Sequence, residues 1–254
     1  MGKIIAIGGG EIGGPRESGG NYPIETANID KEIISLAKKN KPKLLFIPTA
    51  SSDSEDYSEH AKKYFSKLGC QVNTLYLINQ KHTQNELEQI ILSTDIIYVG
   101  GGNTLKMMMI WRRLGIDKIL KKAYEQNIVL SGISAGSICW FSYGNSDSRI
   151  FTSNSKQLIK VTGLSLINAL LCPHYGSEIN RQKELKRMMK STPRIVALAV
   201  DDCCAIEIID SKFRIIKSKP NAKAYKMCWK NGKYFKNEII SNDEFEDLDE
   251  LLTK

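Results

Sequence analysis

The chain has 254 residues, a length that suits one large domain or at most two small ones. Hydrophobic residues make up 42% of it and charged residues 25%, which is typical of a soluble globular protein. No run approaches the roughly 18–20 apolar residues that a membrane span needs. The N-terminus lacks the pattern of a secretory signal, so we expect a cytoplasmic protein with no membrane partner.

The net charge of +8 raises the question of a nucleic-acid partner. The lysines are scattered over positions that read as solvated helix faces, and they form no basic stripe interleaved with aromatic residues. We therefore expect no nucleic-acid partner, although a basic surface can favour acidic substrates by electrostatic steering.

The six cysteines are widely spread and show no Cys-x-x-Cys spacing. This pattern argues against a zinc site, and a disulfide framework is not expected in a chain of this size. The sequence therefore predicts reduced, buried thiols and no metal.

Short apolar runs alternate with longer amphipathic ones through the first half of the chain. Regular alternation of strands and helices implies right-handed crossovers and a mostly parallel sheet with helices on both faces. We expect a doubly wound, three-layer α/β/α fold in which functional groups gather at the carboxyl ends of the strands. The predicted strands span 3–8, 43–48, 71–77, 95–99 and 128–132, and the predicted helices span 28–40, 55–68, 83–92, 105–113 and 116–126.

The C-terminal part has a different character, with short strands predicted at 195–200, 204–209 and 213–217. A hairpin is expected around Asn231-Gly232, which is a strong turn signal. The acidic tail from Asn242 onward is predicted to be helical. Because no change of composition marks a linker, we expect a single domain, 1–254, in which β-hairpins extend the sheet.

The most informative motif is Gly-x-Ser-x-Gly, with Gly132, Ser134 and Gly136 at its fixed positions. It directly follows the apolar run 128–130 and precedes the apolar run 138–141. A strand, a tight turn and a helix start are the setting of a nucleophile elbow, which presents a serine hydroxyl beside free helix amides. The motif alone is short enough to arise by chance, so its partners decide the interpretation.

A nucleophilic serine needs a base, and the chain has three histidines. His60 lies on the polar face of a lysine-rich predicted helix and His82 in a loop, so both are expected to be exposed to solvent. His174 instead ends an apolar segment at Pro173, a strand-end position like that of the serine. A histidine packed at a turn is the alternative, and we favour the catalytic interpretation.

The base needs a carboxylate to orient it. Asp201 and Asp202 follow the strongly apolar run 197–200, which is a better place to reach a histidine than the position of Asp147. Asp202 is our choice, with Asp201 and Asp147 as alternatives. Any one of these aspartates could instead be an ordinary turn residue.

The oxyanion needs hydrogen-bond donors. The amide of Ala135 is one candidate, and the amide of Gly101 or Gly102 is the second, because a glycine loop allows close approach. The alternative is a plain glycine turn in which Asn103 caps the next helix.

The glycine-rich segment 8–14 could be mistaken for a dinucleotide-binding fingerprint. Prolines and further glycines follow it where a helix should begin, and no suitable acidic residue ends the next strand. We therefore expect no nucleotide cofactor.

The chain resembles the dipeptidase E and cyanophycinase family of serine peptidases, peptidase family S51. The resemblance rests on the segments 99–103, 132–137 and 173–175, together with Arg181. It implies a fold similar to class I glutamine amidotransferases and a triad in the chain order Ser134, His174, Asp202. It also suggests Asn103 and Arg181 as substrate-binding residues.

The sequence departs from the family pattern in two respects. Dipeptidase E is expected to carry glutamate where this chain has Asp202, and the segment after His174 lacks both the histidine-rich and the arginine-rich patterns of its relatives. We predict a serine peptidase that acts on short peptides without a cofactor, with Asp-containing dipeptides as one substrate class. A cyanophycinase-like hydrolase and a catalytically decayed peptide-binding protein are the alternatives. A glutamine amidotransferase is disfavoured because the elbow holds serine, and a homodimer is left open.

Overall fold

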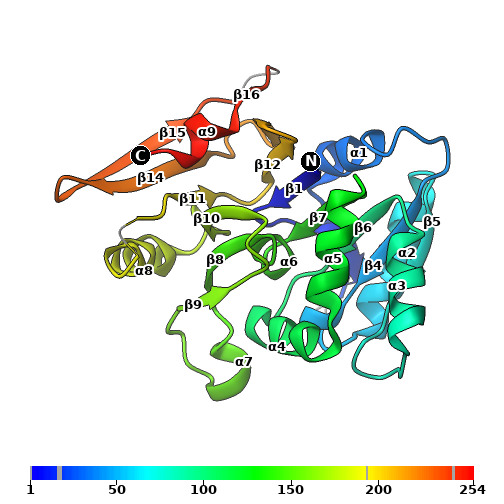
Figure 1. The fold of residues 1–254 in the computed structure, drawn as a ribbon. Helices are drawn as coiled ribbons and strands as arrows, with labels where there is room; N and C mark the ends of the chain where they lie inside the picture. The colour runs from blue at the N-terminus through cyan, green and yellow to red at the C-terminus, as the bar shows by residue number, and fades with distance from the viewer. Residues whose placement is uncertain (1, 16–18, 193, 242–243) are drawn as a thin grey trace.

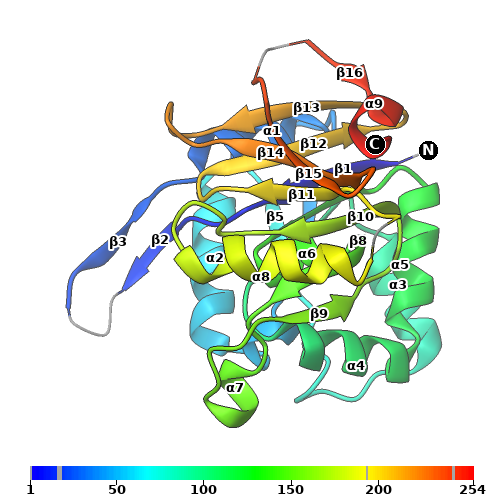
Figure 2. The same cartoon turned by 90° about the vertical axis from the view of Figure 1, so that its left-hand side faces the viewer.

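The computed structural model describes residues 2–15, 19–192, 194–241 and 244–254. Within these ranges the chain forms an eight-stranded sheet, a six-stranded sheet and a two-stranded hairpin. Helices cover both faces of the larger sheet, and the hairpin projects from the body of the molecule (Figures 1 and 2).

Five parallel strands form the centre of the larger sheet, and antiparallel strands extend it beyond β1. The parallel part follows the order β1 (Lys3–Ile7), β7 (Val129–Ile133), β6 (Ile96–Val99), β4 (Lys43–Ile47) and β5 (Gln71–Thr74). The extension consists of β12 (Cys204–Ile209), β13 (Lys212–Lys217) and β16 (Glu246–Asp247).

The alternation of side chains along β1 explains the three layers of this part. Ile4 and Ala6 pack into one cluster of buried side chains, whereas Ile5 and Ile7 pack into another on the opposite face. The first cluster includes residues of α3 (Gln84–Leu92), α4 (Thr104–Leu114) and α5 (Ile116–Glu125), and the second includes residues of α1 (Ala27–Ser35) and α2 (Glu55–Lys67). This is the doubly wound, mostly parallel arrangement that the sequence predicts.

The second sheet differs from the expected single, extended sheet. After β7 and the one-turn helix α6 (Ala135–Ile138), the chain leaves the first sheet and returns to it only at β12. The order of the second sheet is β15 (Lys233–Ile239), β14 (Ala224–Lys230), β11 (Ala197–Val200), β10 (Ile167–Cys172), β8 (Phe141–Ser146) and β9 (Ile159–Thr162). The hairpin at Asn231-Gly232 forms as predicted, but it extends this sheet. Helix α8 (Ile179–Lys190) packs on β10 and β11 through Leu185 and Met189.

The remaining elements are short. They are the hairpin strands β2 (Ile12–Pro15) and β3 (Asn21–Ile24), the 3-10 turn η1 (Thr49–Ser51), and the helices α7 (Ile150–Ser153) and α9 (Leu248–Leu252). The acidic tail is thus helical only in α9, and Asn242 and Asp243 lie outside the described residues. All six cysteines are buried and free, as predicted. Across the described ranges, no helix combines the length and the apolar character required to cross a bilayer.

The two sheets meet at the carboxyl end of β1. The amide of His174, just after β10, donates to the carbonyl of Gly8, and the amide of Cys203 donates to the carbonyl of Gly9. One cluster of buried side chains includes residues of both sheets, among them Leu130 and Leu171. Strand ends from both sheets therefore come together beside β7, where the elbow lies.

Candidate active site

The Gly-x-Ser-x-Gly segment forms the sharp turn between β7 and α6. Ser134 has φ 53° and ψ −112°, a strained backbone conformation for a residue with a side chain. The flanking glycines are sterically required, because a Cβ atom at Gly132 would lie 2.3 Å from the carbonyl oxygen of Gly136. A Cβ atom at Gly136 would lie 2.1 Å from the carbonyl oxygen of Val99. The motif therefore has the structural setting that the sequence predicts for a nucleophile elbow.

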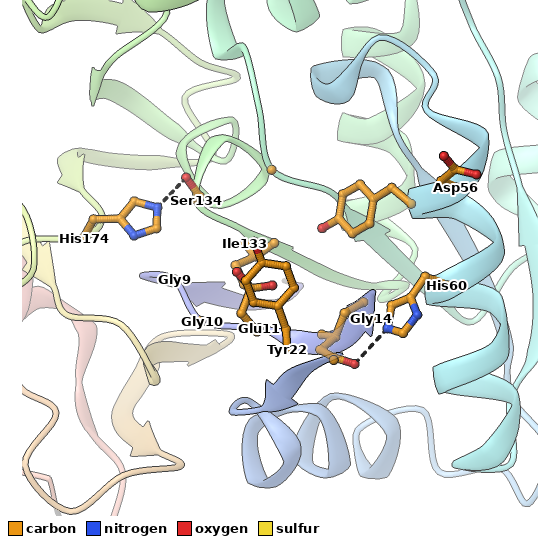
Figure 3. A pocket seen from close by; sticks show the side chains of 14 residues that line it. Gly9, Gly10, Glu11, Gly14, Tyr22, Asp56, His60, Ile133, Ser134 and His174 are labelled. Atoms are coloured by element: carbon orange, nitrogen blue, oxygen red, sulfur yellow. Dashed lines mark hydrogen bonds between the residues drawn. The ribbon is translucent and has the colours of Figure 1, made fainter. Parts of the chain in front are cut away.

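Ser134, His174 and Asp202 form a hydrogen-bonded chain. The Nε2 atom of His174 lies 2.8 Å from Oγ of Ser134, as Figure 3 shows, and its Nδ1 atom lies 2.6 Å from the carboxylate of Asp202. A carboxylate only accepts hydrogen bonds, so Nδ1 carries the proton and Nε2 can accept one from the serine hydroxyl. The arrangement places a base against the hydroxyl, with a carboxylate that fixes the tautomer of the base.

The environment of Asp202 keeps its carboxylate charged. Burial acts to raise its pKa, but the hydrogen bond from His174, the interaction with the His174 charge, a hydrogen bond from Ser177 and the charge of Arg181 outweigh burial. The net effect is a pKa below the usual value for aspartate. The carboxylate can therefore stabilise a positive charge on the imidazole.

The two alternative aspartates lie elsewhere. Asp201 accepts a hydrogen bond from the amide of Lys223 at 3.1 Å, and Asp147 lies 3.7 Å from the guanidinium of Arg181. Of the three candidates, Asp202 is the one in contact with the ring of His174.

Gly9 forms the floor beneath the histidine and the aspartate. A Cβ atom at this position would lie 2.0 Å from Oδ1 of Asp202 and 2.4 Å from Nδ1 of His174. Any side chain here would displace the pair. Gly9 lies just after β1, and the sequence indicates no role for it, since a close approach between distant segments leaves no local pattern.

The predicted oxyanion residues separate into two environments. Gly101 borders the cavity beside Ser134, and a Cβ atom there would lie 3.7 Å from Cβ of Ser134. Gly102 turns away, since its Cβ atom would lie 2.3 Å from the carbonyl oxygen of Ala50. Ala135 is the first residue of α6, directly after the serine. Of the two glycines, the geometry favours Gly101.

The two predicted substrate-binding residues have structural partners instead. Asn103 is 4% exposed, and its side chain caps α4 by accepting a hydrogen bond from the amide of Lys106 at 3.0 Å. Arg181 is 1% exposed, and its guanidinium contacts the carboxylate of Glu178 and the carbonyl oxygen of Asn145. Neither residue lines the cavity beside Ser134. Asn103 thus has a capping role and Arg181 a buried ion-pair role, and their contact with substrate stays a prediction.

A cavity of about 390 Å³ extends from Ser134 toward α2 and the β2–β3 hairpin (Figure 3). Its wall includes His60, which is half-buried rather than exposed, because its Nε2 atom lies 3.1 Å from the carbonyl oxygen of Ile12 in the hairpin. His82 is also half-buried, with Nε2 3.0 Å from the carbonyl oxygen of Tyr76. The expectation that both histidines are exposed is wrong, because each is held by a contact with another segment.

Two acidic side chains, Glu11 and Asp56, line the same cavity. No group of three or more histidine, cysteine, aspartate or glutamate side chains that could hold a metal ion occurs within the described ranges.

An elbow serine hydrogen-bonded to a histidine, on a doubly wound sheet, is typical of the class of hydrolases that form a covalent intermediate on serine. Residues 17–216 match the model of peptidase family S51, and the chain belongs to this family. The chain is therefore a peptidase, and thus a hydrolase, as the resemblance predicted.

Relatives along most of the chain agree with this assignment. The chain is 33% identical over 228 residues to an uncharacterized peptidase, YgaJ, of Bacillus subtilis (strain 168), covering 89% of this chain and 92% of that protein. It is 24% identical over 201 residues to a peptidase E of Nostoc sp. (strain PCC 7120), covering 74% and 78% respectively.

Solved structures confirm the α/β fold. The crystal structure of a peptidase from an acI-B1 actinobacterium is similar with a TM-score of 0.70 at 16% identity, covering 97% of both chains. A putative peptidase E from Listeria monocytogenes EGD-e is similar with a TM-score of 0.59 at 19% identity, covering 85% of this chain and 98% of that one. At these identities the similarity concerns the fold alone.

Proposed function

We propose that this protein is a serine peptidase that hydrolyses short peptides with Ser134 as the nucleophile. The observation that carries the proposal is the continuous hydrogen-bonded chain from Oγ of Ser134 through His174 to Asp202. It holds the hydroxyl, the base and the orienting carboxylate in the order that acyl transfer requires.

In the proposed mechanism, Oγ of Ser134 attacks the carbonyl carbon of the scissile peptide bond while Nε2 of His174 takes the hydroxyl proton. The imidazolium then gives this proton to the leaving amine, and an acyl-enzyme remains. A water molecule, deprotonated by His174, attacks the acyl carbon and releases Ser134. Asp202 holds the ring and stabilises its charge, and the amides of Gly101 and Ala135 stabilise the oxyanion.

The size and lining of the cavity support short peptides as substrates. A volume of about 390 Å³ accommodates a few residues, and the hairpin and α2 close its far side. Specificity for an acidic side chain has less support, because Arg181 is buried in ion pairs and the acidic side chains in the cavity wall favour a cationic group. This lining disfavours the aspartyl dipeptidase and cyanophycinase-like options, and the intact chain of hydrogen bonds disfavours a decayed binding protein.

The proposal is tested by comparing wild type and Ser134→Ala on a library of dipeptides and tripeptides that includes Asp-X and Lys-X peptides. We expect hydrolysis by wild type and none above background by the variant. Ser131→Ala is the matched control, because this buried serine of β7 donates to the carbonyl of Ile97 and lies in the same strand as the elbow. Equal hydrolysis by Ser134→Ala would refute the proposal.

A further inference from the structure

Tyr57 is the third residue of α2, and its ring is fixed on two sides. It stands edge-on to Phe46, with ring centroids 5.1 Å apart and an interplanar angle of 81°. On another side it meets the backbone of the glycine loop after β6, since a Cβ atom at Gly100 would lie only 2.8 Å from Cε1 of Tyr57. Ser54 caps the helix by accepting a hydrogen bond from the amide of Tyr57. The ring is therefore held rigidly beside the loop that carries Gly101.

The hydroxyl of Tyr57 belongs to the cavity of the elbow serine. Tyr57, Gly101 and Ser134 all line this cavity, and a Cβ atom at Gly101 would lie 3.7 Å from Cβ of Ser134. Burial raises the pKa of Tyr57 to about 12. The phenol therefore lines the same cavity as the glycine whose amide the mechanism assigns to the oxyanion.

The proton of this hydroxyl is available. Across the part of the chain that the structure describes, this hydroxyl donates no hydrogen bond to another residue, whereas Tyr64 on the same helix donates to Asp30 at 2.8 Å. Because its pKa is far above neutrality, Tyr57 remains a neutral phenol that can act as a donor. A rigid donor that lines the same cavity as Gly101 and the elbow serine can take a substrate oxygen as its partner.

We propose that Tyr57 is a further catalytic residue, whose hydroxyl donates to the carbonyl oxygen of the substrate as it becomes an oxyanion. The inference rests on the proposed function of Ser134. The contribution is larger in the transition state than in the ground state, because negative charge develops on the oxygen only as Ser134 attacks.

The test uses Tyr57→Phe, which removes the hydroxyl and keeps the ring against Phe46 and Gly100. The substrate-independent probe is a fluorophosphonate, which reports the same activation of the serine. Oγ of Ser134 forms a bond to phosphorus, the phosphorus–fluorine bond breaks, fluoride leaves, and the serine proton passes to His174. Tyr64→Phe is the matched control, because it removes a phenol hydroxyl from the same helix that faces Asp30 instead of the cavity.

We expect Tyr57→Phe to lower the rate constant of fluorophosphonate labelling by about 10- to 100-fold, near the effect of losing one oxyanion donor. On any peptide that wild type cleaves, kcat should fall similarly while KM changes little. The melting temperature should stay close to that of wild type, whereas Tyr64→Phe should label at the wild-type rate even if it melts earlier.

Two outcomes separate the inference from the proposal on which it rests. If Tyr57→Phe is labelled at the wild-type rate, the role of Tyr57 is overturned and that of Ser134 stands. The same holds if it is labelled faster, which would mean that the hydroxyl obstructs the probe. Equal labelling of wild type and Ser134→Ala overturns the proposed function itself. If Tyr64→Phe lowers the labelling rate constant as much as Tyr57→Phe does, the effect comes from packing of the helix, and the inference is also overturned.

Discussion

Replacing Gly9 with alanine tests how closely the two sheets hold the hydrogen-bonded chain of Ser134, His174 and Asp202. The new Cβ atom would lie 2.0 Å from Oδ1 of Asp202 and 2.4 Å from two atoms of the His174 ring. Carbon and oxygen atoms at van der Waals contact are well over 3 Å apart, so the aspartate and the histidine must move by about 1 Å or more. The Gly9→Ala variant therefore separates a base from its orienting carboxylate without changing either side chain.

The magnitude follows from the role of the displaced pair. Loss of the orienting carboxylate in a serine triad costs about 10⁴-fold in kcat, equivalent to roughly 5 kcal/mol of barrier. Because the pair can relax partly, we expect Gly9→Ala to lower kcat by about 10³- to 10⁴-fold. Stability should fall by only about 1–2 kcal/mol, because the displaced atoms are side-chain ends and the backbone of Gly9 is not in the left-handed region.

Gly69→Ala is the matched control. Nothing lies within 4 Å of a Cβ atom at Gly69, but its φ of +96° is unfavourable for alanine, so this variant should lose stability and keep its activity. The assays are peptide hydrolysis, fluorophosphonate labelling and urea unfolding of both variants. A Gly9→Ala enzyme whose kcat stays within tenfold of wild type would refute the reasoning, since the triad would then tolerate the displacement.

The choice of Asp202 as the carboxylate that orients His174 is tested by two variants. Asp202→Asn should lower kcat by about 10⁴-fold, and Asp201→Asn should change kcat by less than about tenfold. The reverse order, measured in the same hydrolysis assay, would transfer the role to Asp201. Burial raises the pKa of Asp30 to about 6 in the folded chain, against a smaller lowering by hydrogen bonds from Thr26 and Tyr64. The folded state thus holds this proton more tightly than the unfolded state, and the free energy of unfolding should fall by about 3 kcal/mol as pH rises from about 3 to about 7. In Asp30→Asn, urea unfolding at several pH values across that range should show a free energy of unfolding that no longer falls by this amount. If the free energy of unfolding of the variant falls with pH as steeply as that of wild type, Asp30 does not cause the decrease. Arg181→Met should lower the free energy of unfolding by about 1–3 kcal/mol, because it leaves the buried carbonyl of Asn145 without its donor. Wild-type stability together with altered peptide preference would instead support the original substrate-binding role.

The parallel core and the elbow could be predicted because their signals are local. The strands β1, β4 and β6 are each an apolar run followed by a glycine or proline turn, and Ser134 lies in a motif whose geometry requires its glycine neighbours. His174 could be found for a similar reason, since an apolar run stops at Pro-His. The cytoplasmic location, the lack of a nucleic-acid partner, the single domain and the homodimer stay predictions.

The second sheet could not be predicted, because its first strand has little apolar signal. β8 contains Ser142, Asn145 and Ser146, which are buried although polar. Their partners come from distant segments, as when Ser146 bonds to Thr104 across 42 residues. A short stretch of sequence contains only one of the two residues in such a contact, so a polar strand such as β8 looks like a loop.

The cavity wall was missed for a related reason. His60 and Tyr57 lie on α2, whose sequence is rich in lysine, and only the packing of the β2–β3 hairpin and the glycine loop against this helix encloses them. The glycine-rich segment 8–14 looked like a failed nucleotide motif. Its use at Gly9 is a close approach to side chains from the second sheet, which no pattern within the segment can indicate.

The most direct measurement of the central claim is the position of a fluorophosphonate adduct by peptide mass spectrometry of the labelled wild-type protein. The account predicts one adduct, on the peptide that carries Ser134, and its loss when the protein is first unfolded in urea, because the hydroxyl is activated only by the folded arrangement with His174. An adduct on another residue, or an unmodified Ser134 in a protein that still cleaves peptides, would contradict it.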